Sequence, residues 1–391
     1  MIQNRQGVKI LPRLLFHIGK GGKVMKKKAI SLFLTGAMVL SLAACGSNAK
    51  SSDTKDTEKK TTETTDKKET VKEAEIKTGD SVNGTVTYNV DMSQYDSGKE
   101  VRVWLPVAQT NDYQTIKDVT YDAGDAEAKL TEDANGNKML YVEWDKDADP
   151  ATRKVTCSFH ASRPEILRPD LKEEGKPGKE LDKYLEASST IPVDGEVKET
   201  ADEITKGKDT YLEKARAIYD WVIANMNRDE SVTGCGKGDV CALLSSKAGK
   251  CTDINSVFIG LCRASGIPAR EMFGVRMNDT DITKNQHCWA QFYLPGTGWV
   301  FADPADVLKA VLKNSWDKDS EDAKKTQEYY WGNCDNQRVE LSEGRDITLE
   351  PAQDGEKLNN FGYPYAEVDG QAVDYYTPDA FVYTISFAED Q

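Results

Sequence analysis

The chain has 391 residues, of which 38% are hydrophobic, and its formal net charge is −14 at pH 7. This length can hold two or three domains, and this apolar share is sufficient for ordinary globular cores. Because an acidic surface repels the phosphates of nucleic acids, the composition excludes a nucleic-acid partner.

The N-terminal residues contain a predicted secretion signal. The basic residues 26–28 precede an apolar run at 29–44, which is shorter than the roughly 20 residues that a spanning helix needs. This order predicts a signal peptide at residues 25–44. Because a signal peptide starts at its basic end, Met25 is the expected first residue, and residues 1–24 are interpreted as untranslated or non-native.

Cys45 directly follows this signal peptide. The small residues Ala43 and Ala44 in front of it resemble the lipobox of bacterial lipoproteins, in which the cysteine is diacylated and becomes the new N-terminus. Two acyl chains hold a protein on a bilayer where one chain is marginal. Residues 45–78 are almost entirely polar and are predicted to be a disordered tether. We therefore expect an extracytoplasmic protein anchored to the cell membrane through Cys45; the alternative is an ordinary secreted protein with an incidental cysteine.

Residues 79–170 are predicted to form an antiparallel β domain, because short runs alternate apolar and polar side chains as half-buried strands do. These runs are 85–90, 101–105, 139–144 and 154–159. Asn135 and Gly136 stand between two of them and predict a hairpin turn. A calcium loop is the weaker alternative, since the third ligand and the distal glutamate of an EF-hand are missing. Residues 171–199 are interpreted as a linker.

The pattern becomes helical near residue 200, and a catalytic core is predicted over residues 200–310. Residues 211–222 place apolar side chains on one face, and a second helix is expected from Cys251 to Ala264. Strands are expected at 272–276, 287–294 and 299–302. Helices followed by sheet within one unit indicate an α+β fold. Residues 311–391 form an aromatic-rich C-terminal extension, whose aromatic clusters either line a substrate groove or pack a cap onto the core.

Cys251 is the candidate nucleophile. It follows Gly249 and Lys250, where the chain turns, and it starts the second predicted helix. A thiol at a helix N-terminus faces the positive end of the dipole, which favours the thiolate that attacks carbonyl groups. The alternative is a small buried cysteine without chemistry.

His287 is the candidate base. The chain has three histidines, of which His17 lies in the leader and His160 at the end of the β domain. His287 is thus the one in the same predicted domain as Cys251. A cysteine nucleophile needs a base nearby that takes its proton and later delivers it to the leaving group.

Asp303 is the candidate partner that orients His287. It shares the face of His287 if the returning strand sets it opposite Trp289 or Gln291. A hairpin loop of three or five residues meets this condition, whereas a loop of four requires a bulge. Asp306 is the rival, but it lies past the expected end of the strand.

With these residues in view, the chain resembles the bacterial transglutaminase-like superfamily. Four separate blocks carry the resemblance, in the order and at the separations of that family. They are GKCTD at 249–253, LCRASGIPAR at 261–270, HCWAQF at 287–292 and GWVFADP at 298–304. The run 101–106 resembles, more weakly, the β domain that often precedes such cores. The resemblance implies a papain-like core in which Cys251, His287 and Asp303 form the triad, in agreement with the roles assigned above.

The sequence also departs from that family. The aromatic residue that often follows the helix bearing Trp221 is absent from residues 225–229, so the oxyanion donor that the sequence offers is the backbone N–H of Cys251. The Ca²⁺ sites of animal transglutaminases have no counterpart. The cysteines lack the short paired spacing of zinc ligands, so we expect no metal and no cofactor.

The other cysteines allow disulfides outside the cytosol. Cys235 and Cys241 would close a Gly-rich loop if they paired. Cys262 and Cys288 are expected to be reduced residues of the core, because they lie in apolar segments.

These residues predict a thiol acyltransferase or hydrolase that forms a thioester on Cys251 from protein or peptide amides, including those of the cell envelope. Crosslinking, deamidation of glutamine and peptide cleavage share the nucleophile, the base and the thioester; the triad does not encode which acceptor is used. The alternative of another class is a catalytically silent surface binding or scaffolding lipoprotein on the same fold. An intact triad argues against that alternative.

Overall fold

The computed structural model describes residues 76–391. The predicted signal peptide at 25–44, the lipid-anchor residue Cys45 and nearly all of the predicted tether at 45–78 lie outside the described residues. Strand β1 begins at Lys77, so the last residues of that predicted tether belong to a strand. Within the described part of the chain, no helix is both long and apolar enough to cross a bilayer.

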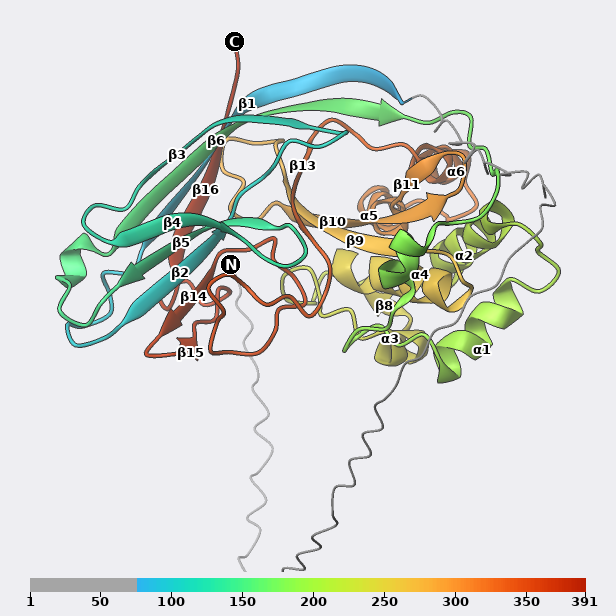
Figure 1. The fold of residues 1–391 in the computed structure, drawn as a ribbon. Coiled ribbons are helices and arrows are strands. Elements are labelled where there is room, and N and C mark those ends of the chain that lie inside the picture. The colour runs from blue at the N-terminus through green and yellow to red at the C-terminus, as the bar shows by residue number, and fades with distance from the viewer. Residues whose placement is uncertain (1–75) are drawn as a thin grey trace, which may run out of the picture. The chain divides into compact units, whose positions relative to one another are not determined.

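Two antiparallel sheets pack face to face as a sandwich (Figure 1). The first sheet has the strand order β16-β1-β6-β3, and the second has the order β15-β14-β2-β5-β4. The strands of the first sheet are β1 Lys77–Asp91, β3 Thr115–Asp122, β6 Lys154–Leu167 and β16 Val382–Glu389. Those of the second are β2 Val101–Pro106, β4 Glu127–Glu132, β5 Lys138–Trp144, β14 Tyr365–Val368 and β15 Gln371–Ala372.

Alternating side chains build the core of this sandwich. In β1, Val86, Tyr88 and Val90 are buried while the residues between them are partly or fully exposed, because successive side chains of a strand point to opposite faces. The hairpin predicted at Asn135 and Gly136 is present: it joins the paired strands β4 and β5. Gly136 has φ +88°, a conformation that glycine adopts without steric cost.

The third sheet, β12-β11-β10-β9-β13, carries the helical part of the molecule (Figure 1). Helix α4 packs on β9 and β10 and is buried along almost its whole length. The strands are β9 Ala269–Arg276, β10 Gln286–Leu294, β11 Gly298–Ala302, β12 Trp331–Gly332 and β13 Arg338–Glu343. The helices are α1 Gly195–Ile204, α2 Tyr211–Asn225, α3 Val240–Ser246, α4 Cys251–Ala264, α5 Pro304–Asn314 and α6 Glu321–Tyr329. Two short strands, β7 Asn227–Arg228 and β8 Ala248–Gly249, pair in parallel just before α4.

The range 311–391, set apart in the sequence as an extension, contributes strands to all three large sheets. Strand β13 pairs with β9, β14 pairs with β2, and β16 pairs with β1. Such pairings join segments that are far apart in the chain, and local sequence patterns do not indicate them. The α+β fold with an antiparallel β domain ahead of the core is confirmed. The chain beyond residue 310 adds strands to both the β domain and the core.

Candidate active site

Cys251 is the first residue of α4, as predicted. The start of this helix is fixed by Asp253, whose carboxylate accepts hydrogen bonds from the backbone N–H of Lys250 at 3.0 Å and of Gly238 at 2.8 Å. The first N–H groups of a helix lack intrahelical acceptors. The N–H of Cys251 is therefore the donor best placed to bind an oxyanion formed at its own thiol.

The Gly-rich loop before α3 wraps over this helix start. Gly236 has φ +94°, and a Cβ there would lie 2.0 Å from Oδ2 of Asp253, so only glycine fits. The backbone N–H of Thr252 donates to the carbonyl of Cys235 at 2.9 Å. These contacts hold Cys235 beside the candidate nucleophile.

His287 lies on β10 and contacts Asp303. Gln291 pairs with Phe301 and Ala290 with Ala302, and the hairpin loop has three residues, so Asp303 comes directly after the strand and opposite Trp289. Its Oδ2 lies 2.7 Å from Nε2 of His287, and both side chains are buried. The expected register is therefore present.

The rival carboxylate lies farther from the ring. Oδ1 of Asp306 is 3.7 Å from Nε2 of His287. Asp303 also caps α5, since its Oδ1 accepts the backbone N–H of Asp306 at 3.0 Å. The geometry thus gives Asp303 the closer contact and leaves Nδ1 as the ring nitrogen available to Cys251.

Sequence reasoning missed the guanidinium groups that hold these carboxylates. Arg338, on β13, is fully buried; its Nη1 donates to Oδ2 of Asp303 and its Nη2 donates to Oδ2 of Asp306 at 2.8 Å. Arg276, on β9, binds the same oxygen of Asp306. Arg338 begins β13, which also contains two glutamates, and Arg276 ends β9, so the local sequence does not indicate that either residue is buried or which partner it binds.

The charges around His287 favour its protonated form. Burial and Arg276 act to lower the pKa of His287, but Asp306 and Asp303 outweigh them and raise it above its ordinary value. Burial likewise acts to raise the pKa of Asp306, but Arg276, His287 and Arg338 hold it well below the usual range. Asp306 is therefore ionised, and His287 faces buried negative charge.

The pKa of the Cys251 thiol is shifted in the opposite direction, below its ordinary value. Hydrogen bonds with Cys235 and Cys288 hold the pKa of Cys251 well below its ordinary value, and His287 adds to this effect although burial opposes it. A lowered thiol pKa beside a raised imidazole pKa favours a thiolate paired with an imidazolium. This pair is the resting state that a cysteine nucleophile requires.

The remaining cysteines are free thiols in the described residues. Cys235 and Cys241, which the sequence allowed to pair, are apart: Cys235 is buried with its sulfur 3.1 Å from the hydroxyl of Tyr363, and Cys241 is exposed on α3. Cys262 and Cys288 are buried, as expected. The sulfurs of Cys235, Cys251 and Cys288 all lie within 4.8 Å of one another.

A second group of potential metal ligands consists of His287, Asp303 and Asp306. The carboxylates of this group already bind the guanidinium groups of Arg276 and Arg338. A cation would have to displace these buried positive charges, so the donor set does not suit a metal.

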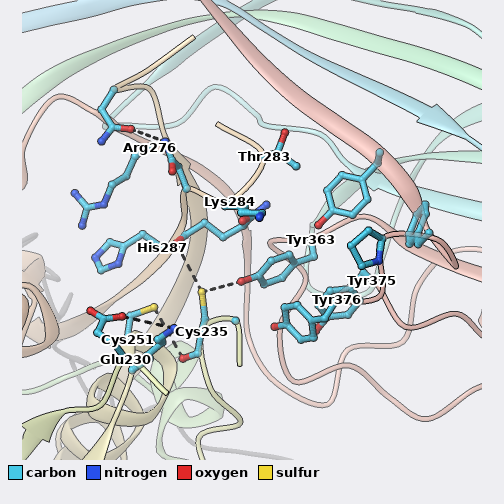
Figure 2. A pocket seen from close by; sticks show the side chains of 18 of the residues that line it. Glu230, Cys235, Cys251, Arg276, Thr283, Lys284, His287, Tyr363, Tyr375 and Tyr376 are labelled. Carbon is cyan, nitrogen blue, oxygen red and sulfur yellow. Dashed lines mark hydrogen bonds and ion pairs between the residues drawn. The ribbon is translucent and has the colours of Figure 1, made fainter. Parts of the chain in front are cut away.

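Cys251 and His287 line a cavity of about 700 Å³ (Figure 2). One wall consists of tyrosines from the last part of the chain, with ring centroids of Tyr363 and Tyr375 4.7 Å apart and stacked. Figure 2 shows Cys235 between Cys251 and Tyr363. The two aromatic clusters of the extension therefore have different positions. Tyr363 lines the cavity, while Trp331 packs against the core.

Comparison with known proteins shows the family of the chain. The sequence profile of the transglutaminase-like superfamily matches residues 198–304. An uncharacterised protein of Haemophilus influenzae is 35% identical over 328 residues, which cover 76% of this chain and 89% of the relative. The chain belongs to the transglutaminase-like superfamily. Its fold is that of thiol-dependent enzymes of this superfamily.

Two solved structures are similar to this chain at low sequence identity. A proposed cysteine protease from Cytophaga hutchinsonii is 15% identical, with a TM-score of 0.49 over 80% of this chain and 100% of that one. The periplasmic domain of TgpA from Pseudomonas aeruginosa is 13% identical, with a TM-score of 0.33 over 62% of this chain and 92% of that one.

Proposed function

We propose that the protein is a thiol acyltransferase or hydrolase that acts on protein or peptide amides through a thioester on Cys251. The observation that carries this proposal is the contact of 2.7 Å between His287 and Asp303 beside a helix-terminal thiol at the floor of a cavity. A thiolate, an imidazole and an orienting carboxylate are the parts that covalent acyl transfer needs.

The chemistry follows from these positions. The thiolate of Cys251 attacks the amide carbonyl, and the backbone N–H of Cys251 stabilises the oxyanion. His287 then gives its proton to the departing amine, and a thioester remains. An acceptor amine or a water molecule next attacks the thioester while His287 takes a proton from it, which releases the acyl product and restores the thiolate. Asp303 fixes the ring throughout.

The lining of the cavity supports substrates that carry a carboxylate. Five basic side chains line it, against the single acidic side chain of Glu230. The basic residues are Arg228, Lys250, Arg276, Lys284 and Lys309. Arg276 pairs with Asp306 and Arg228 pairs with Glu230, so Lys284 and Lys309 provide positive charge that these carboxylates do not compensate. This charge would attract acidic peptides and repel basic ones.

The test uses the fragment that starts at residue 76. It is incubated with glutamine-containing peptides and cell-wall peptides that bear acidic or neutral flanking residues, with and without an amine donor. Mass spectrometry distinguishes amine incorporation, deamidation and cleavage. Cys251→Ala is the control, because it removes the sulfur and keeps the fold. Turnover that persists in Cys251→Ala would contradict the proposal.

We further propose that the protein is extracytoplasmic and attached to the membrane by lipid on Cys45. The support is the sequence pattern alone: a basic segment, a short apolar run and small residues before the cysteine. Cys45→Ser should release the protein from the membrane fraction or leave it unprocessed. A native protein whose intact mass includes no acyl chains would overturn this.

A further inference from the structure

Three buried thiols meet beside the nucleophile, and acyl transfer uses only one of them. Cys235 comes from the Gly-rich loop, Cys251 from the start of α4 and Cys288 from β10. Each is at most 3% exposed, and their sulfurs are mutually within 4.8 Å. Buried cysteines often act as small apolar residues. Three that converge on one point from separate elements call for another explanation.

We propose that Cys235, Cys251 and Cys288 form a binding site for one soft metal ion, Zn²⁺ or Cu⁺, whose occupancy blocks the nucleophile. Thiolate donors select soft ions of this kind. The ion would replace the remaining thiol protons, which leave to solvent, and form three metal–sulfur bonds. With Cys251 bound to the ion, its sulfur has no free electron pair directed at a substrate carbonyl.

The distances suit such a site. A zinc–sulfur bond is about 2.3 Å, so three sulfurs around one ion are separated by about 4 Å. Because the thiols lie within 4.8 Å of one another, small side-chain rotations bring them to that separation. Cys235 and Cys251 line the cavity, so an ion has a route to the thiols.

The surroundings also suit thiolate ligands. The hydroxyl of Tyr363 lies 3.1 Å from the sulfur of Cys235, and the hydroxyl of Thr252 lies 3.0 Å from that of Cys288. Hydroxyl groups at these positions can donate to thiolates and orient them, which is the role of the groups that support metal ligands. The basic side chains of the cavity compensate the negative charge that the bound site retains.

This site escaped sequence reasoning because its ligands have no short paired spacing. Zinc motifs are recognised by pairs of ligands a few residues apart. Here Cys235, Cys251 and Cys288 are brought together by the hydrogen bond from Thr252 to the loop and by the packing of α4 on β10. The expectation of no metal was based on the spacing of the cysteines in the sequence, whereas the proposed ligands come together only in the folded chain.

The test titrates the reduced fragment from residue 76 with Zn²⁺ and, in a separate anaerobic series, with Cu⁺, each against a chromophoric chelator. Cd²⁺ serves as a probe because its thiolate complexes absorb in the ultraviolet. We expect one ion per chain, and Cys235→Ser or Cys288→Ser should weaken binding by more than about tenfold and lower the Cd²⁺ absorbance by about a third. Cys241→Ser and Cys262→Ala, which alter cysteines outside the cluster, should bind as the unaltered chain does. Circular dichroism confirms that each variant is folded.

A second readout does not depend on catalysis. Bound Zn²⁺ should protect Cys251 from iodoacetamide, and this protection should be lost in Cys288→Ser. The inference is overturned if the unaltered, reduced chain binds no ion, or if Cys235→Ser and Cys288→Ser bind the ion as tightly as the unaltered chain does. A reduced chain that turns over no amide in the absence of metal, but binds the added ion through three thiols, would uphold this inference and defeat the proposed function.

Discussion

Between the two sandwich sheets the buried side chains form an apolar cluster, whereas next to His287 on β10 several buried side chains are charged. Val86, Leu140 and Ile385 belong to one continuous hydrophobic cluster of the sandwich. Asp303 and Arg338, next to the candidate site, are equally buried but form an ion pair. Apolar burial stabilises by removing area from water, and each side chain contributes separately.

The charged interior follows a different rule. Desolvation of buried ions is costly and is offset only when all partners are present. Arg338 joins Asp303 and Asp306, and Arg276 joins Asp306, so these four groups depend on one another. The site is thus stabilised by ion pairs that depend on one another, while the sandwich is stabilised by many apolar contacts that contribute separately. We therefore expect single substitutions next to His287 to have larger and less additive effects on stability and turnover than substitutions in the sandwich.

The largest effect is expected on turnover when Asp303 is changed. Asp303→Asn should keep the fold but lower kcat by about 10³ to 10⁴, because the amide no longer holds the productive form of His287. Asp303→Ala should be worse, and both should retain more activity than Cys251→Ala. Steady-state kinetics on the best peptide measures this. If Asp306→Asn lowers kcat more than Asp303→Asn, the orienting role belongs to Asp306.

Loss of the shared guanidinium tests the interdependence directly. Arg338→Met should lower the free energy of unfolding by about 3–5 kcal/mol, since it removes one charged partner from each of two buried carboxylates. Ile385→Val in the sandwich should cost only about 0.5–1.5 kcal/mol. Urea denaturation compares the two. Adding Asp306→Asn to Arg338→Met should cost less than the sum of the single changes, and strict additivity would contradict the comparison.

Thiol reactivity separates the active site from the apolar core around it. Iodoacetamide near neutral pH should label Cys251 at least about tenfold faster than Cys262 or Cys288, because only Cys251 has a lowered thiol pKa. His287→Ala should slow that labelling. Peptide mapping after short exposures gives the rates. Equal rates at all three cysteines in the folded protein would count against the triad.

The smallest effect concerns the charged lining of the cavity. Lys284 is exposed there, so Lys284→Glu should raise KM for an acidic peptide about fivefold and leave kcat unchanged. Lys313→Glu, an exposed residue of α5 outside the lining, carries the same change of charge and should have no effect. An equal rise in KM for both variants would point to net charge alone.

The sequence predicted the elements that have a local pattern. Helix α4 matches the expected range from Cys251 to Ala264, because its apolar pattern ends at a Gly-Ile-Pro stop signal. The contact between His287 and Asp303 followed from strand register and a three-residue loop. Strands β3 and β4 were not predicted, because their side chains are partly or fully exposed and show no buried alternation.

The contacts that complete the site could not be predicted in this way. Arg338 is recognisable as a site residue only once β13 is known to pair with β9. Cys235 enters the site through a loop whose path depends on Asp253. Both contacts are tertiary, and nothing in the neighbouring residues specifies a partner that lies so far along the chain.

Strands beyond residue 310 pair within all three large sheets, and this has a consequence for when the site is completed. A ribosome completes Cys251, His287 and Asp303 before it has made Arg338 and the tyrosine wall of the cavity, and chains generally begin to fold from the N-terminus during synthesis. A nascent or truncated chain would therefore contain Cys251 without Arg338, which binds Asp303 and Asp306, and without the tyrosines that line the cavity. The site is therefore complete only when residues near the end of the chain have been added and have paired with the earlier strands.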